Sequence, residues 1–274
     1  MPDIGHKAMN QTACVEIHYQ DRPLALTYFR EGNGPVLLYL HGWGQNHQAF
    51  LPLIESLGEG YEHIAIDCPG FGASSMSPEA WDTGNYAECV VNLMDQLQIE
   101  RATLVGHSFG GRVAVRMAHR WPHKVERLIL IASAGLKRKV AWTKKLRVQT
   151  IQKSAKLLQA IVPNPWGSRL KNAIYQRIAS ADYQQAGLLR PTLVKVVNED
   201  LAPLLPGIQT NALLMWGEQD LATPPELGQR MSDLLPYAEY VQLPGFDHYS
   251  ILTRGRHQCA HQIKQFLQTA SEMA

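Results

Sequence analysis

The strongest constraint on the fold is a regular alternation of short apolar runs with segments whose apolar residues recur at helical spacing. Residues 36–40 and 64–66 are short apolar runs, typical of strands that are buried on both faces of a sheet. Between residues 85 and 98 the apolar side chains fall on one face of a helix. Strands that alternate with helices in this way predict a parallel sheet with helices on both faces.

The alternation extends over most of the chain. The strand-like segments are residues 13–19, 24–29, 36–40, 64–66, 102–105, 128–132, 212–216 and 239–243. The helical segments are residues 46–57, with Asn46 as the cap, and residues 85–98, 110–120, 225–235 and 258–269. The sequence therefore predicts an α/β fold with a mostly parallel, doubly wound, eight-stranded sheet.

The alternation stops between residues 136 and 206, where the pattern is helical and is broken into short pieces by proline and glycine. Between Lys137 and Arg177 there are eleven Lys and Arg residues and no Asp or Glu. A segment whose composition differs from its surroundings is typical of an inserted module. We therefore predict a core formed by residues 1–135 and 207–274, and a helical cap, residues 136–206, inserted between two strands of that core.

One serine lies where a predicted strand meets a predicted helix, in Gly106-His107-Ser108-Phe109-Gly110. A serine at such a junction occupies a sharp turn that presents its hydroxyl above the end of the sheet. Glycines two residues before and after it remove side chains that would obstruct the turn. The helix that follows directs its N-terminus at the site, where it stabilises negative charge. Ser108 is therefore a candidate nucleophile.

Together with this turn, four other features follow one another in a fixed order. They are His41-Gly42-Trp43-Gly44 after an early strand, the loop Asp67-Cys68-Pro69-Gly70-Phe71-Gly72-Ala73-Ser74, the inserted segment, and finally an acid and a histidine after the last strands. In this order the chain resembles the α/β-hydrolase superfamily from about residue 13 to residue 270. The resemblance implies the α/β-hydrolase sheet with an inserted helical cap.

The resemblance also implies a catalytic triad in the order Ser108, Asp220, His248. Asp220 matches the acid of the family, and Glu218, which is nearer to the preceding strand, is the competing candidate. His248 matches the catalytic histidine, whereas His107 is expected to pack behind the serine. A serine in the turn excludes the relatives that use an aspartate nucleophile there, the epoxide hydrolases and haloalkane dehalogenases.

An acyl-transfer mechanism also needs two N–H donors for the developing oxyanion. One is expected from the backbone of Phe109, the residue after the nucleophile. The second, by resemblance, is expected from Trp43. His41 is expected to order the loop that carries Trp43, and Asp67 to stabilise a turn at a strand end.

The cap has three open interpretations. Its basic residues can form a solvated outer face, attract an anionic substrate, or contact a membrane surface through a basic amphipathic helix. Arg190 is a candidate substrate-binding residue because related carbon–carbon-bond hydrolases place a cap arginine near the substrate. Tyr249, next to the predicted catalytic histidine, is a second candidate.

Composition and cysteine spacing limit the possible cellular location, cofactors and partners of the protein. The cysteines, Cys14, Cys68, Cys89 and Cys259, form no Cys-x-x-Cys pair, which argues against a structural zinc site. No apolar run is long enough to span a membrane, no secretory signal is visible, and no motif predicts nucleic-acid binding. We therefore expect a cytoplasmic protein that acts on a small ester or acyl substrate without a metal or organic cofactor; a homodimer is left open.

The predicted activity is that of a serine hydrolase, a carboxylesterase that cleaves an ester through an acyl-enzyme. Three alternatives stay open. A carbon–carbon-bond hydrolase of ring-fission products would use the same triad, and so would a thioesterase or acyltransferase. The third is a receptor-like protein that binds a ligand and turns it over slowly.

Overall fold

The computed structural model of the protein describes residues 12–137 and 186–268. Its centre is one eight-stranded sheet with the strand order β1-β2-β4-β3-β5-β6-β7-β8. β2 pairs antiparallel with both β1 and β4, and every other neighbouring pair is parallel. The predicted mostly parallel, eight-stranded sheet is confirmed.

The strands lie where the apolar runs predict them. Their bounds are β1 Thr12–Tyr19, β2 Arg22–Gly32, β3 Val36–Leu40, β4 Glu62–Ile66, β5 Ala102–His107, β6 Val125–Ile131, β7 Ala212–Gly217 and β8 Ala238–Leu243. All six residues of β5 are buried, as are all six of β7. These central strands are covered on both faces, which explains why they read as continuous apolar runs.

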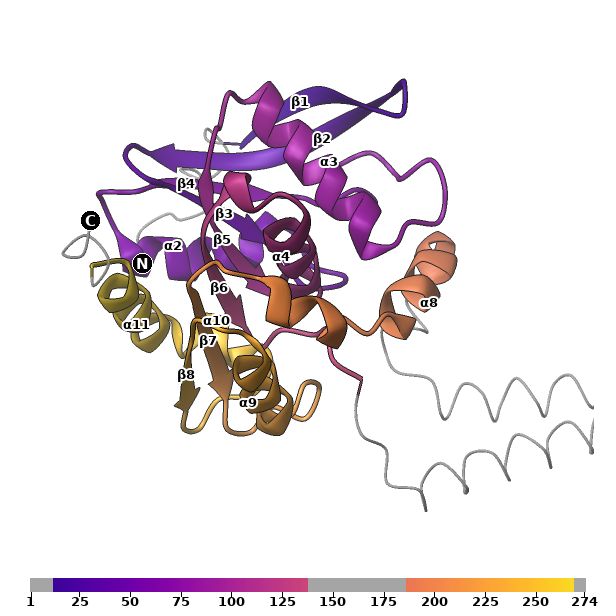
Figure 1. Ribbon diagram of the computed structural model, residues 1–274. Helices are drawn as coiled ribbons and strands as arrows, with labels where there is room; N and C mark the ends of the chain where they lie inside the picture. The colour runs from indigo at the N-terminus through magenta and orange to yellow at the C-terminus, as the bar shows by residue number, and fades with distance from the viewer. Residues whose placement is uncertain (1–11, 138–185, 269–274) are drawn as a thin grey trace, which may run out of the picture.

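The helices form a layer on each face of the sheet (Figure 1). α3 (Thr83–Gln96), α4 (Phe109–Arg120) and α9 (Pro225–Leu234) share one apolar core with the side chains of Leu38 and Leu40 on β3. α2 (Leu51–Leu57), α10 (Ser250–Thr253) and α11 (Arg256–Gln268) share the other core with Leu37 and Tyr39. Because successive side chains of a strand point to opposite faces of the sheet, β3 contributes residues to both cores.

Helix starts follow local side-chain chemistry. The Asn46 side chain accepts from the backbone N–H of Gln48 at 3.0 Å, so the predicted cap is present, but the first turn, His47–Phe50, is a 3-10 helix (η1). α3 starts at Thr83, two residues before the predicted start, because the Asp82 side chain caps it by accepting from the N–H of Asn85. α10 was not predicted, since four residues give no readable helical period.

The predicted cap is described only in part. Residues 138–185, which hold most of its basic residues, lie outside the described residues. The described end consists of η3 (Gly187–Leu189), α8 (Arg190–Asn198) and η4 (Ala202–Gly207), which lead into β7. The carboxylate of Glu199, just after α8, accepts from the backbone N–H of Thr83 at 3.0 Å and joins this segment to the start of α3.

Candidate active site

Ser108 lies in the sharp turn between β5, which ends at His107, and α4, which begins at Phe109. Its backbone has φ 50° and ψ −109°, a conformation that residues other than glycine rarely adopt. Hydrogen bonds on both sides hold it: the N–H of Ser108 donates to the carbonyl of Ile131 at 3.2 Å, and its own carbonyl accepts from the N–H of Ala134 at 3.0 Å. The turn is therefore imposed by the end of neighbouring β6.

The flanking glycines are required by close backbone approach. A Cβ at Gly110 would lie 1.9 Å from the carbonyl oxygen of Leu40, and one at Gly106 would lie 2.7 Å from the Cα of Gly111. No side chain fits at either distance. The two glycines therefore let α4 and β3 close around Ser108, as the sequence pattern predicts.

The structure brings the predicted serine, histidine and acid together at the carboxyl ends of the strands. His248, in the loop after β8, places its Nε2 2.9 Å from Ser108 Oγ. Its Nδ1 lies 2.7 Å from Oδ2 of Asp220, in the loop after β7. His248 and Asp220 are 6% and 2% exposed, so their contact is shielded from water. A shielded relay of this kind can take the proton from a serine hydroxyl.

Of the two candidate acids, Asp220 contacts the histidine and Glu218 does not. Glu218 is exposed, and its carboxylate accepts from the N–H of Gly245 at 3.3 Å. Asp220 turns inward because its own N–H donates back to the carbonyl of Gly217 at 3.2 Å.

Thr223 is a site residue that the sequence did not predict. Its hydroxyl lies 2.9 Å from Asp220 Oδ2, 3.2 Å from His248 Nδ1 and 3.0 Å from the carbonyl of Ala132. Its backbone N–H donates to the other carboxylate oxygen of Asp220 at 2.8 Å. Both oxygens of Asp220 are therefore held by one residue. The signal in the sequence was a threonine three residues after the acid, which has no meaning without the loop conformation.

His107 packs directly behind His248. Its Nε2–H donates to the backbone carbonyl of His248 at 2.9 Å, and the two rings have centroids 4.9 Å apart. Burial, followed by the nearby His248, lowers the pKa of His107 to about 3, so the ring is neutral near pH 7. Since a carbonyl only accepts, the one proton of the neutral ring is on Nε2. His107 thus anchors the loop of His248, in keeping with its expected packing role.

The loop that carries Trp43 is ordered by His41. The N–H of Cys68 donates to His41 Nε2 at 3.0 Å, so the His41 Nδ1–H donates to the carbonyl of Gly42 at 2.7 Å. The same carbonyl accepts from the N–H of Gln45 at 3.1 Å. Burial lowers the pKa of His41 to about 4, which keeps this neutral arrangement.

Two backbone N–H groups stay available for an oxyanion. In a trans peptide the N–H points opposite to the carbonyl, so fixing the carbonyl of Gly42 directs the N–H of Trp43 to the other side. Within the described residues, neither this N–H nor that of Phe109 donates a hydrogen bond. The Trp43 and Phe109 rings pack edge to face at 5.5 Å, which joins the two loops. Trp43 and Phe109 remain the proposed oxyanion donors.

Asp67 holds the second loop. Its Oδ1 accepts from the N–H of His47 at 2.7 Å, and its Oδ2 accepts from the N–H of Ala73 at 3.0 Å. Although burial raises the pKa of the Asp67 carboxyl, these bonds together with the His47 ring lower it overall. A Cβ at Gly72 would meet the same carboxylate at 2.0 Å, which explains the glycine. The geometry suits the expected structural role of Asp67.

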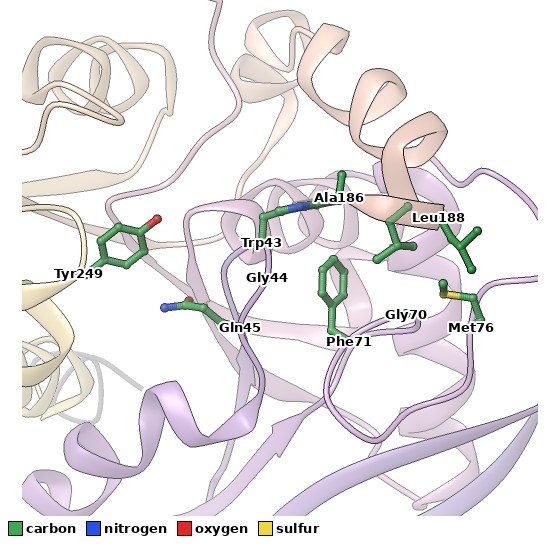
Figure 2. A pocket seen from close by; sticks show the side chains of 10 residues that line it. Trp43, Gly44, Gln45, Gly70, Phe71, Met76, Ala186, Leu188 and Tyr249 are labelled. Atoms are coloured by element: carbon green, nitrogen blue, oxygen red, sulfur yellow. The ribbon is translucent and has the colours of Figure 1, made fainter. Parts of the chain in front are cut away.

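A cavity of about 570 Å³ borders the loop of Trp43 (Figure 2). Tyr249, the residue after His248, lines one end with Gln45, while Phe71 and Met76 lie toward the other. Among the described residues, its lining consists of Trp43, Gly44, Gln45, Gly70, Phe71, Met76, Ala186, Leu188, Leu189 and Tyr249, none of them charged. Ser108 and His248 are not among the described lining residues, although Tyr249 follows His248 directly, so the role of Tyr249 in substrate binding stays a prediction.

Arg190 begins α8 and is exposed. It is not part of the described cavity lining, although Leu188 and Leu189 just before it are. Its role in substrate binding stays a prediction.

Comparison with known proteins places the chain in a family. The family model described as the alpha/beta hydrolase fold matches residues 35–255, which include every residue of the proposed triad. The chain belongs to the α/β-hydrolase family. Membership of this family confirms the expected resemblance and makes a hydrolase the coarse functional assignment.

The relatives differ in what they act on. Over 104 residues the chain is 38% identical to a pimeloyl-[acyl-carrier protein] methyl ester esterase of Pseudoalteromonas atlantica, covering 38% of this chain and 39% of that protein. It is 27% identical to a 2-hydroxy-6-oxononadienedioate/2-hydroxy-6-oxononatrienedioate hydrolase of a Pseudomonas species, covering 76% of each. The match to the first curated relatives, uncharacterised mycobacterial proteins, spans only 32% of their length.

Solved structures share the fold. A thermophilic esterase from Thermogutta terrifontis superposes with a TM-score of 0.71 at 22% identity, over 94% of this chain and 98% of that one. At this identity the likeness concerns the fold alone. In the part of this chain that the structure describes, no helix has the length and apolar character needed to cross a bilayer.

Proposed function

We propose that the protein is a serine hydrolase that cleaves uncharged carboxylic esters through an acyl-enzyme on Ser108. The observation that carries the proposal is the continuous relay from Ser108 Oγ to His248 Nε2 at 2.9 Å, and from His248 Nδ1 to Asp220 Oδ2 at 2.7 Å. Such a relay is most effective beside donors for an oxyanion, and the N–H groups of Trp43 and Phe109, which donate no hydrogen bond within the described residues, are the proposed donors.

In the first step, neutral His248 takes the proton of the Ser108 hydroxyl while Oγ attacks the ester carbonyl carbon. The oxyanion that forms accepts from the N–H groups of Trp43 and Phe109. His248 then gives its proton to the alcohol oxygen as the carbon–oxygen bond breaks. Asp220 stabilises the imidazolium during this step by accepting from Nδ1–H.

In the second step, a water molecule gives a proton to His248 and attacks the acyl carbon. The new oxyanion collapses, the bond to Ser108 Oγ breaks, and His248 returns the proton to Oγ. The acid leaves and the enzyme is regenerated. Besides the ester and one water molecule, each step involves side chains and backbone groups of this chain.

The cavity supports an ester with an apolar acyl group. Its described lining is uncharged, and Phe71, Met76 and Leu189 present apolar surface. An anionic substrate would need a cation there to offset its desolvation, and the described lining supplies none. Most of the basic residues of the predicted cap lie outside the described residues.

The proposal is tested with p-nitrophenyl esters from acetate to decanoate, beside a thioester and a vinylogous diketo acid. We expect kcat/KM to rise from acetate to the middle chain lengths, because each methylene buried in the apolar end contributes about 0.8 kcal/mol, roughly fourfold. Efficient cleavage of the diketo acid with poor turnover of every oxygen ester would instead identify a carbon–carbon-bond hydrolase. Preference for the thioester would identify a thioesterase.

A further inference from the structure

Gln45 is a polar side chain at the end of the cavity nearest the catalytic histidine, and the mechanism above gives it no role. Its Oε1 accepts from the N–H of Gly42 at 3.0 Å and lies 3.1 Å from His107 Nδ1. A Cβ on Gly42 would lie 2.6 Å from this oxygen, so the amide is seated tightly against the oxyanion loop.

The oxygen of the Gln45 amide is thus used inside the protein, and Gln45 is also one of the residues that line the cavity. Figure 2 shows the side-chain nitrogen directed to the side on which Tyr249 lies. Within the described residues, this nitrogen makes no hydrogen bond. A polar group on the wall of a cavity, without a hydrogen-bond partner among the described residues, is available to a substrate.

The two inner contacts of the amide favour opposite orientations of its oxygen and its NH₂ group. The N–H of Gly42 calls for the amide oxygen, while the bare Nδ1 of neutral His107 calls for the amide NH₂. In one direction the amide offers the cavity a donor, and in the other an acceptor. A hydroxyl is the small group that matches both, because it donates and accepts.

The proton transfer from His248 determines which side of the ester lies beside Gln45. The leaving alcohol oxygen receives its proton from His248, so the alcohol side must lie next to that ring. The Tyr249 ring is 5.1 Å from the His248 ring between centroids, and His107 contacts both Gln45 and the loop of His248. The alcohol side therefore lies at the end of Gln45 and Tyr249, and the acyl chain extends toward Phe71 and Met76.

We propose that Gln45 is a specificity-determining residue that hydrogen-bonds a second hydroxyl on the alcohol side of the substrate. The substrate class is then an ester of an apolar acid with a diol or polyol. This inference rests on the proposed ester hydrolysis and deepens it.

The test compares two isosteric esters with the same acyl group, 2-hydroxyethyl butyrate and propyl butyrate. We measure kcat/KM for both in the wild-type protein, in Gln45→Met and in Gln45→Leu. Dividing the ratio for the wild-type protein by the ratio for each variant cancels the intrinsic reactivity of the two esters. It also cancels any general loss caused by a less ordered oxyanion loop. We expect the preference for the hydroxyethyl ester to fall about 3- to 10-fold, the effect of one hydrogen bond. Two variants are used so that failure of one to fold leaves the other.

Tyr249→Phe and Met76→Ala are the matched controls. Tyr249→Phe removes the other polar group at this end, and Met76→Ala changes only the apolar end. The proposal is overturned if the preference survives in both Gln45 variants, or if Tyr249→Phe alone abolishes it. If the wild-type protein hydrolyses both esters with no preference that depends on Gln45, the ester activity stands and this inference falls. If the wild-type protein hydrolyses neither ester, the proposed function itself fails, and this inference fails with it.

Discussion

The hydroxyl of Thr223 lies 2.9 Å from Asp220 Oδ2 and within 3.2 Å of His248 Nδ1, so one buried side chain contacts both members of the acid–histidine pair. It has a single proton, which either Asp220 or the carbonyl of Ala132 can accept. In both cases the hydroxyl adds a polar contact to a pair that is shielded from water. Thr223 is therefore a candidate for positioning Asp220 and His248.

Thr223→Val keeps the shape of the side chain and removes the hydroxyl. We expect kcat/KM for a p-nitrophenyl ester to fall roughly 3- to 10-fold, mostly in kcat, which corresponds to about 1 kcal/mol for one buried hydrogen bond. Thr223→Ser restores the hydroxyl and should recover most of the rate. A Val variant with wild-type kcat would show that this hydroxyl does not affect the pair.

The acid is tested by two isosteric changes. Asp220→Asn should lower kcat on the order of 10³- to 10⁴-fold, because an amide can hold the imidazole in the wrong tautomer and does not stabilise the imidazolium. Glu218→Gln changes an exposed residue outside the relay and should leave kcat within about twofold, given that it does not contact the histidine. The reverse order of effects would assign the acid to Glu218.

Gly110→Ala should prevent stable folding or lower the free energy of unfolding by at least about 3 kcal/mol. The reason is the 1.9 Å approach of the new Cβ to the carbonyl oxygen of Leu40, which cannot move without opening the sheet. Gly207→Ala is the matched control, because its Cβ would meet only ordinary contacts, 3.6 Å from the ring of His119. Urea unfolding of both variants measures the difference, and equal stabilities would contradict the close approach.

Stability should decline as pH falls below about 6.5, the usual pKa of a histidine. Burial lowers the folded-state pKa of His41 to about 4 and of His107 to about 3, and it also lowers that of His63. Between these values and 6.5 the unfolded chain binds protons that the folded chain does not, so acidification favours unfolding. Urea unfolding from pH 8 to pH 5 should show a falling free energy of unfolding below pH 6.5. A value that stays constant or rises as pH falls would contradict neutral, buried histidines.

The strands and the order of the site could be predicted because they depend on local pattern. β7 is an apolar run, β5 is largely apolar up to Val105, and Gly106 and Gly110 bracket Ser108 at a strand–helix junction. Each of these signals is contained within a few neighbouring residues. The choice of Asp220 over Glu218 needed the resemblance, because both follow the same strand.

The roles of Thr223 and Gln45 could not be predicted, because each depends on a contact between segments that are far apart in the sequence. Thr223 contacts His248, 25 residues away, and Gln45 contacts His107, 62 residues away. No periodicity records such contacts. The predicted cap stays a prediction, since residues 138–185 lie outside the described part of the chain, and so does the role of Arg190, which is described but is not part of the cavity lining.

The most direct test of the account is Ser108→Ala, assayed with p-nitrophenyl butyrate beside the wild-type protein. We predict a loss of kcat on the order of 10⁴-fold or more, since the nucleophile of a serine hydrolase has no substitute in the relay. Mass spectrometry of the wild-type protein, quenched during turnover, should show a butyryl group on Ser108. A Ser108→Ala variant that folds and keeps wild-type turnover would contradict the central claim.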